Sequence, residues 1–282
     1  MSQSTANPLA KHFRQPSLYI KLPSGGKYWE EDSLELPASG EIPIYPMTAK
    51  DEIIIRTPDA LLNGESVVQV IQNCCPSIKN AWKMPSVDVD STLIAIRIAS
   101  YGAEMPIDTT CPHCSHANRH DVELPDILQR IKSPDYNKLI PIGDLKIKIK
   151  PQNYFESNRK NLILFEEDRI MQTVNDDDLS DEDKIKKFNE HLEKLVDLNM
   201  QIVSSSTEYI EMQDGTKVTN PEFIKEYFQN CENAVFKKML SGLEEMNKVA
   251  ELPKVNLMCE ECEKEYPAKM EFDYANFFDV SY

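Results

Sequence analysis

Apolar and polar positions in the N-terminal third of the chain form short segments that each match one structural element. Residues 17–22 alternate between apolar and polar side chains as a strand does, and residues 48–51 have the form of a helix-capping box. Residues 65–74 repeat apolar side chains at helical spacing. Residues 90–101 do the same and stop at Gly102. We therefore predict short helices packed on a small sheet.

The pattern beyond residue 140 predicts longer helices. Residues 144–150 alternate like a half-buried strand, and residues 153–171 are typical of a helix. Strand-like residues on both sides of Asp214-Gly215 predict a hairpin at about 208–218. Asn220-Pro221 then begins a single long helix that reaches Met246. We interpret the apolar stripe of this helix as core: Ile224, Tyr227, Phe228, Cys231, Val235, Met239, Leu243 and Met246.

One segment of this C-terminal part is strongly acidic. Residues 166–183 contain nine acidic side chains and one basic side chain. A run of like charges is usually solvated, so we predict a surface loop here. Ser180 and Asp183 then form the start of another helix.

Charge and glycine content disfavour broad classes of function. Acidic residues outnumber basic residues by 47 to 31, which gives a formal net charge of −16 and disfavours direct binding to nucleic acid. Only 8 of 282 residues are glycine, about 3% against an average of roughly 7%, and the sequence has no P-loop and no GxGxxG motif. We find no secretory signal, no apolar stretch of membrane-spanning length and no catalytic motif. We therefore expect an intracellular, non-enzymatic protein without a small-molecule substrate.

Two CxxC motifs carry the strongest chemical signal, namely Cys111 with Cys114 and Cys259 with Cys262. Two thiolates separated by two residues can converge on one ion, and two such pairs complete a tetrahedral zinc site. Four thiolates leave no coordination position open for water. We therefore predict one structural zinc per chain rather than a catalytic metal.

The segments around the two motifs are alike, because each motif lies between an incoming and a returning strand. This arrangement predicts a zinc ribbon, although 144 residues separate the inner cysteines where roughly 15 to 20 are usual. We expect an α+β fold with a mixed N-terminal region at 1–104. A split zinc ribbon would follow at 105–152 plus 253–282, with a large, mainly helical insertion at 153–252.

Other interpretations of these cysteines stay open. Cys111 and Cys114 could form the redox pair of a thiol–disulfide oxidoreductase, the four cysteines could be unligated, or a nearby histidine could replace one ligand. The candidate histidines are His113, His116 and His120. We interpret Cys74, Cys75 and Cys231 as small buried hydrophobes.

The N-terminal part contains a series of distinctive segments at residues 18–29, 44–52, 57–64 and 88–101, followed by Cys-Pro-His-Cys. Together these segments resemble the base-plate hub protein family of T-even-like bacteriophages. The resemblance implies a structural or assembly protein of the tail base plate, with other hub or wedge proteins as partners. It would assemble in the host cytoplasm and be located in the virion tail. No catalytic residue follows from the resemblance.

A second class of function is a cytoplasmic zinc-ribbon adaptor that binds nucleic acid or the transcription machinery. The net charge disfavours the nucleic acid but not a basic protein partner.

Two segments are candidates for partner contacts or for internal packing, namely the Lys/Ile strand at 145–150 and the aromatic C-terminus at 274–282.

Overall fold

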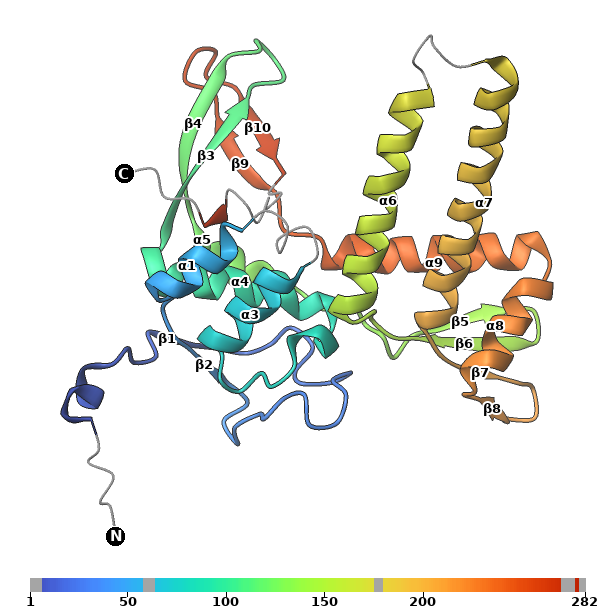
Figure 1. Ribbon diagram of the computed structural model, residues 1–282, viewed down its shortest axis with the longest axis horizontal. Coiled ribbons are helices and arrows are strands. Elements are labelled where there is room, and N and C mark those ends of the chain that lie inside the picture. Colours follow the sequence, from blue (N-terminus) through green and yellow to red (C-terminus); the bar gives the residue numbers. More distant parts are fainter. Residues whose placement is uncertain (1–6, 58–63, 175–179, 270–276, 279–282) are drawn as a thin grey trace.

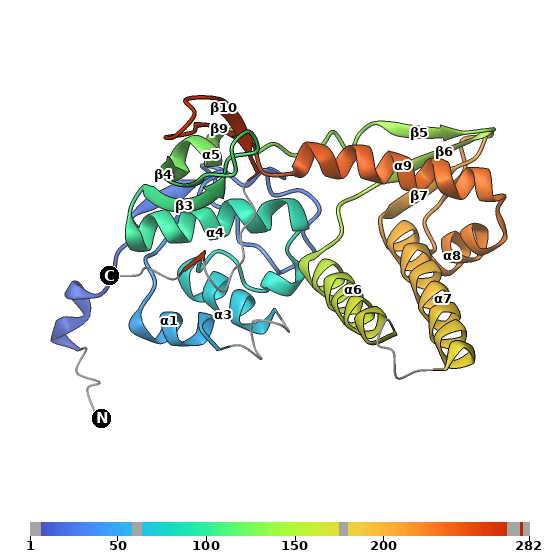
Figure 2. The same ribbon diagram turned by 90° about the horizontal axis from the view of Figure 1, so that it is seen from above.

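The chain folds into two lobes that lie side by side (Figures 1 and 2). The computed structural model describes residues 7–57, 64–174, 180–269 and 277–278. One lobe contains the N-terminal helices and carries two β-hairpins, and the other contains the long helices and a four-stranded sheet. Helices and strands are mixed in both lobes, which confirms the α+β class.

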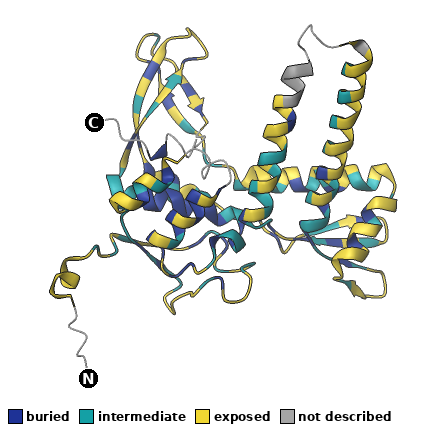
Figure 3. Cartoon of the chain, viewed as in Figure 1, coloured by how far each residue is buried: buried dark blue, intermediate teal, exposed yellow. Residues whose placement is uncertain are grey.

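The first lobe is built around a central helix. Its elements up to that helix are η1 (Pro8–His12), β1 (Leu18–Ile20), β2 (Ile42–Ile44), α1 (Ala49–Ile55), α3 (Glu65–Cys74), η2 (Ala81–Lys83) and α4 (Ser86–Tyr101). β1 and β2 pair antiparallel. Helix α4 buries residues on all its faces, as expected for a helix at the centre of a core. Buried positions concentrate around it in Figure 3.

Phe277 and Phe278, near the C-terminal end of the sequence, belong to the core of the first lobe. Phe277 is 5% exposed and Phe278 is 1% exposed, and both join the core cluster around α4. The Arg97 guanidinium lies 5.5 Å from the centre of the Phe277 ring. These two side chains therefore pack internally rather than face a partner.

Most predicted elements of this lobe are present, but α4 begins earlier than expected. The capping box of α1 is formed by Thr48 and Asp51, and Gly102 ends α4 with a φ of 97°. We predicted the start of α4 at residue 90, whereas it begins at Ser86 after Pro85. Asp88 acts inside the helix, where its carboxylate binds a distant loop instead of capping the helix.

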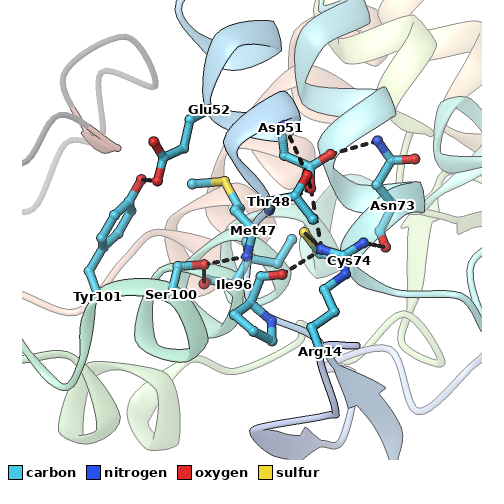
Figure 4. Close-up of polar contacts among 11 residues, drawn as sticks. Arg14, Met47, Thr48, Asp51, Glu52, Asn73, Cys74, Ile96, Ser100 and Tyr101 are labelled. Carbon is cyan, nitrogen blue, oxygen red and sulfur yellow. Dashed lines mark hydrogen bonds and ion pairs between the residues drawn. The ribbon is translucent and has the colours of Figure 1, made fainter. Parts of the chain in front are cut away.

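Arg14 fastens the N-terminal arm to this lobe (Figure 4). Its guanidinium donates hydrogen bonds to the carbonyl oxygens of Pro46 and Asn73. It also forms an ion pair with Asp51, at 3.2 Å. One side chain thus joins the arm to the segment before α1, to α1 itself and to the end of α3.

The second lobe combines the four-stranded sheet with four helices. The strands are β5 (Leu139–Ile142), β6 (Leu145–Ile149), β7 (Thr207–Glu211) and β8 (Lys217–Val218), and the helices are α6 (Tyr154–Val174), α7 (Asp181–Ser205), α8 (Pro221–Asn230) and α9 (Asn233–Ala250). Each strand pairs antiparallel with the next in the order β5-β6-β7-β8. Ile147 and Ile149 of β6 are fully buried in the core of this lobe. β5 and β6, which the sequence-based division grouped with the ribbon, thus pack on the insertion.

The predicted hairpin is present as β7 and β8, but the single long helix after it is wrong. Two helices, α8 and α9, replace it, because Cys231 and Glu232 adopt extended backbone angles. The bend allows Phe228 of α8 and Met239 of α9 to enter the same core. The interpretation of the apolar stripe as core is confirmed, since its members lie in or against this cluster.

The predicted acidic loop is also wrong where the structure describes it. Residues 166–174 continue α6, and residues 175–179 lie outside the described part of the chain. The Glu167 carboxylate, 3% exposed, accepts hydrogen bonds from Lys194 at 2.7 Å and from His191 at 2.9 Å. These contacts between α6 and α7 neutralise part of the acidic segment and favour a helix over a loop. Ser180 caps α7 as predicted.

Candidate metal centre

Two β-hairpins of the first lobe each present one CxxC motif in their turn. The first hairpin consists of β3 (Glu104–Thr110) and β4 (Ala117–Glu123), and the second consists of β9 (Val255–Met258) and β10 (Glu265–Ala268). Figures 1 and 2 show the hairpins side by side, although they are far apart in the sequence. α5 (Leu124–Arg130) follows β4, and α9 leads back to β9.

The two turns have nearly the same backbone geometry. The N–H of Cys111 donates to the carbonyl of His116 at 2.9 Å, and the N–H of Cys259 donates to that of Lys264 at 3.0 Å. One residue after each second cysteine, the backbone adopts a left-handed conformation. The matching φ angles are 61° at Ser115 and 56° at Glu263. These turns are paired knuckles, which direct two sulfur atoms each to one point.

All four predicted cysteine ligands come together. Their Sγ atoms lie within 4.8 Å of one another. The Sγ atoms of Cys111 and Cys262 are 3.7 Å apart, and those of Cys114 and Cys259 are 3.6 Å apart. Cys111 and Cys259 are buried, Cys262 is half-buried and Cys114 is exposed.

This spacing fits a tetrahedral metal ion. Sulfur atoms 2.3 Å from a tetrahedral zinc ion would be separated by about 3.8 Å along each edge. The two close pairs agree with that value, and four thiolates form a donor set that zinc prefers. Within the described residues, the group that can hold an ion contains these cysteines and no histidine.

The thiols of the cluster perturb one another. Burial tends to raise the pKa of Cys259, but the backbone N–H groups of Cys262 and Glu261, together with the neighbouring thiols, lower it to about 6. At Cys114 the backbone N–H of His116 favours the thiolate, yet burial and the neighbouring thiols raise the pKa to about 12. The Cys114 thiol therefore does not ionise readily at neutral pH unless a cation compensates the charge of its thiolate.

Contacts between the hairpins support the cluster, and no sequence pattern indicated them. The N–H of Glu260 donates to the Asn118 side-chain oxygen at 2.9 Å. The hydroxyl groups of Thr109 and Tyr266 are 2.7 Å apart. Both contacts cross from one hairpin to the other, so they hold the knuckles in register close to the cysteines.

The remaining cysteines lie away from the cluster. Cys74 and Cys75 are fully buried in the first core, and Cys231 is half-buried against the second core. The first CxxC motif sits in a hairpin turn, whereas a helix N-terminus is the feature that lowers thiol pKa in thioredoxin-like enzymes. The structural context thus favours a ligand role over a redox role for Cys111 and Cys114.

Comparison with known proteins decides the family. A family model described as T4 bacteriophage base plate protein matches residues 16–279. The chain belongs to this family. The match extends through both lobes and includes all four cysteines of the cluster. Searches of curated proteins and of solved structures found no significant match.

Membership in the base plate family defines the general role of the chain. It is a structural protein of a phage base plate, which implies association with other base plate proteins and a location in the virion tail. In the described part of the chain, none of the helices is both long and apolar enough to cross a membrane.

Proposed function

We propose that this base plate protein is a non-enzymatic component of the hub, stabilised by one structural zinc ion bound to Cys111, Cys114, Cys259 and Cys262. The convergence of four Sγ atoms within 4.8 Å of one another carries the zinc part of the proposal. The N-terminal segments that resemble the hub protein family, which include β1 and most of α4, support the hub part. Assembly would take place in the host cytoplasm before the protein enters the tail.

The two knuckles together form a split zinc ribbon in this proposal. Its two parts, at 105–152 and 253–282, lie before and after an insertion at 153–252, and an N-terminal region at 1–104 precedes them. Strands β5 and β6 pack on the insertion, so the ribbon itself would consist of β3, β4, β9 and β10. A metal ion at the knuckles would join the two ends of the insertion and fix its base to the first lobe.

Metal content tests the zinc site directly. We expect purified protein to contain about one zinc per chain by mass spectrometry, and Cys259→Ser to lose it because one of four ligands is missing. Structural zinc stabilises small domains by on the order of 10 kcal/mol, so the same variant should melt at a lower temperature. Cobalt in place of zinc should give the absorption spectrum of a tetrahedral thiolate site.

Cys231→Ser provides a matched control, since Cys231 is half-buried but lies outside the cluster. This variant should retain its zinc. A wild-type protein without metal, or a Cys259→Ser variant with unchanged zinc content, would contradict the proposal. A readily reducible disulfide between Cys111 and Cys114 in metal-free protein would instead favour thiol–disulfide chemistry.

Reconstitution tests the hub assignment. The protein is mixed with purified hub proteins or with purified wedge proteins of the same phage, and complexes are measured by size-exclusion chromatography with light scattering. We expect a stable complex with a hub component. A complex formed only with wedge proteins would place the chain elsewhere in the base plate, and binding only to transcription proteins would favour the adaptor function.

A further inference from the structure

Two neighbouring cavities lie where α6 meets the rest of the second lobe. The larger has a volume of about 290 Å³ and is lined by α6, α7 and the start of α8. The smaller has a volume of about 230 Å³ and is lined by the end of β6, α6 and α9. Gln152, Lys160 and Ile202 line both cavities. We call the two cavities together the α6 cleft, with Lys160 at the boundary between its chambers.

The α6 cleft is rich in cations, although the chain is strongly acidic. Its basic residues are Lys150, Arg159, Lys160 and Lys225, and its acidic residues are Glu156 and Glu222. Glu156 is already engaged, because its carboxylate accepts a hydrogen bond from the N–H of Asn153 at 3.0 Å. The smaller chamber is lined by two lysines and, among the described residues, by no carboxylate. The lining of the cleft thus carries a net positive charge, whereas the chain as a whole is negatively charged.

Lys160 is the residue of the cleft whose environment most favours the binding of an anion. It is half-buried, and burial lowers the pKa of its ammonium group. Within the described chain it has no ion pair and no hydrogen-bond partner. A half-buried ammonium group without a partner is unfavourable, and an adjacent carboxylate would compensate it.

The larger chamber supplies an apolar wall. Phe155 and Ile163 of α6 line it together with Leu198 of α7. Phe155 is 52% exposed, so an aromatic ring stands open to solvent at this position. The size and wall of the larger chamber suit a single large side chain of a polypeptide.

We propose that the α6 cleft binds an acidic peptide segment of a partner protein. A large apolar side chain of the segment would fill the larger chamber, and a neighbouring carboxylate would lie beside Lys160. This proposal rests on neither the zinc site nor the hub assignment, because the cleft lies in the other lobe. It extends the general role of a base plate protein by naming a surface and the chemistry that fits it.

Peptide binding to the full-length protein tests the proposal. The probe is a fluorescent heptapeptide with phenylalanine between two glutamates and with glycine and serine on both sides. Its affinity is measured by anisotropy against a peptide with lysines in place of the glutamates and another with serine in place of the phenylalanine. We expect the glutamate–phenylalanine peptide to bind at least about tenfold more tightly than either, because it alone satisfies both chambers.

Variants assign the binding to the cleft. Lys160→Met keeps the apolar stem and should weaken binding about tenfold, whereas Lys160→Arg keeps the charge and should retain it. Phe155→Ser should weaken binding of the phenylalanine peptide alone. Lys186→Met is the control, because Lys186 is an exposed residue of α7 about 18 Å along the helix from the cleft residues near Leu198. Circular dichroism verifies that each variant is folded.

Several outcomes would overturn the proposal. Equal binding of the lysine peptide would show that the cations do not select the ligand, and equal binding of the serine peptide would show that the apolar chamber is not used. Unchanged affinity in folded Lys160→Met would place the binding elsewhere. Full displacement by equimolar inorganic phosphate would identify a site for a free anion instead of a peptide.

Discussion

Asp88 provides a quantitative test of how the first lobe is held together. Its carboxylate is fully buried and accepts three hydrogen bonds. They come from the N–H of Ser24 at 2.7 Å, the hydroxyl of Ser24 at 2.6 Å and the indole N–H of Trp29 at 3.0 Å. The change Asp88→Asn preserves the size of the side chain and one accepting oxygen but removes the ionisable group. Any pH dependence of stability that is due to Asp88 should therefore vanish in the variant.

The expected size of the pH-dependent change in stability follows from the pKa of Asp88. Burial raises the pKa of Asp88 from 3.8 to about 6, and the hydrogen bonds from Ser24 and Trp29 offset only part of this rise. Between these two values the folded protein binds more protons than the unfolded chain, so the free energy of unfolding falls as the pH rises. A difference of about 2 pKa units at 1.36 kcal/mol each corresponds to about 3 kcal/mol. Relative to Asp88→Asn, the wild-type protein should lose this amount between about pH 4 and pH 7.

Urea unfolding of both proteins at several pH values measures this difference. Trp29 and Trp82 are the two tryptophans of the chain, and both pack against the core of the first lobe. Tryptophan fluorescence therefore reports on the lobe that contains Asp88. The reasoning would be refuted if the stability difference between wild type and variant were independent of pH, or if it shifted toward the wild type as the pH rose.

Three further changes test other parts of the structure. Phe278→Ala should lower the free energy of unfolding by about 3–5 kcal/mol in urea titrations, because it empties a position that is 1% exposed. Glu167→Gln should lower the melting temperature at pH 7, since hydrogen bonds from Lys194 and His191 lower the pKa of Glu167. The effect should shrink as the pH falls through the lowered pKa of Glu167, where the wild-type carboxylate also becomes protonated. Thr48→Ala should cost about 0.5–2 kcal/mol in the same urea titrations, because α1 loses its cap.

Each of these changes has an outcome that would contradict its basis. A Phe278→Ala variant as stable as wild type would mean that the C-terminal segment does not pack in the core. If the difference in melting temperature between wild type and Glu167→Gln stayed the same in acid, where the carboxylate is protonated, the charged hydrogen bonds could not be its cause. A Thr48→Ala variant with an undiminished free energy of unfolding would show that the capping box adds no net stability.

The sequence predicted elements well wherever a local signal agreed with the tertiary structure. The capping box at Thr48 and the hairpin at Asp214-Gly215 are formed by residues close in sequence, and both are present. The cysteine cluster could also be predicted, because two equal spacings of two residues indicated matching turns. In these cases the chemistry of a few neighbouring residues determines the local backbone.

The incorrect predictions share a dependence on distant contacts. α4 begins at Ser86 without a side-chain cap, and Asp88 in its first turn accepts hydrogen bonds from Ser24, 64 residues earlier. The bend between α8 and α9 has neither glycine nor proline, and it follows from the shape of a core to which both helices contribute. The α6 cleft had no sequence signal either, because its cations come from segments between residues 150 and 225.

The separation of the two knuckles along the sequence has a consequence for how the protein is synthesised. Cys114 and Cys259 are separated by 144 residues, and the ribosome must synthesise all of them before it reaches the second knuckle. At roughly 5–20 residues per second, the first pair of thiols would leave the ribosome about 7–30 seconds before the second. During that interval the first hairpin has only half of the ligand set, while the second lobe has time to fold. Closure of the cluster therefore reports that the segment between the two knuckles has been translated, and a chain interrupted within that segment would be left without it.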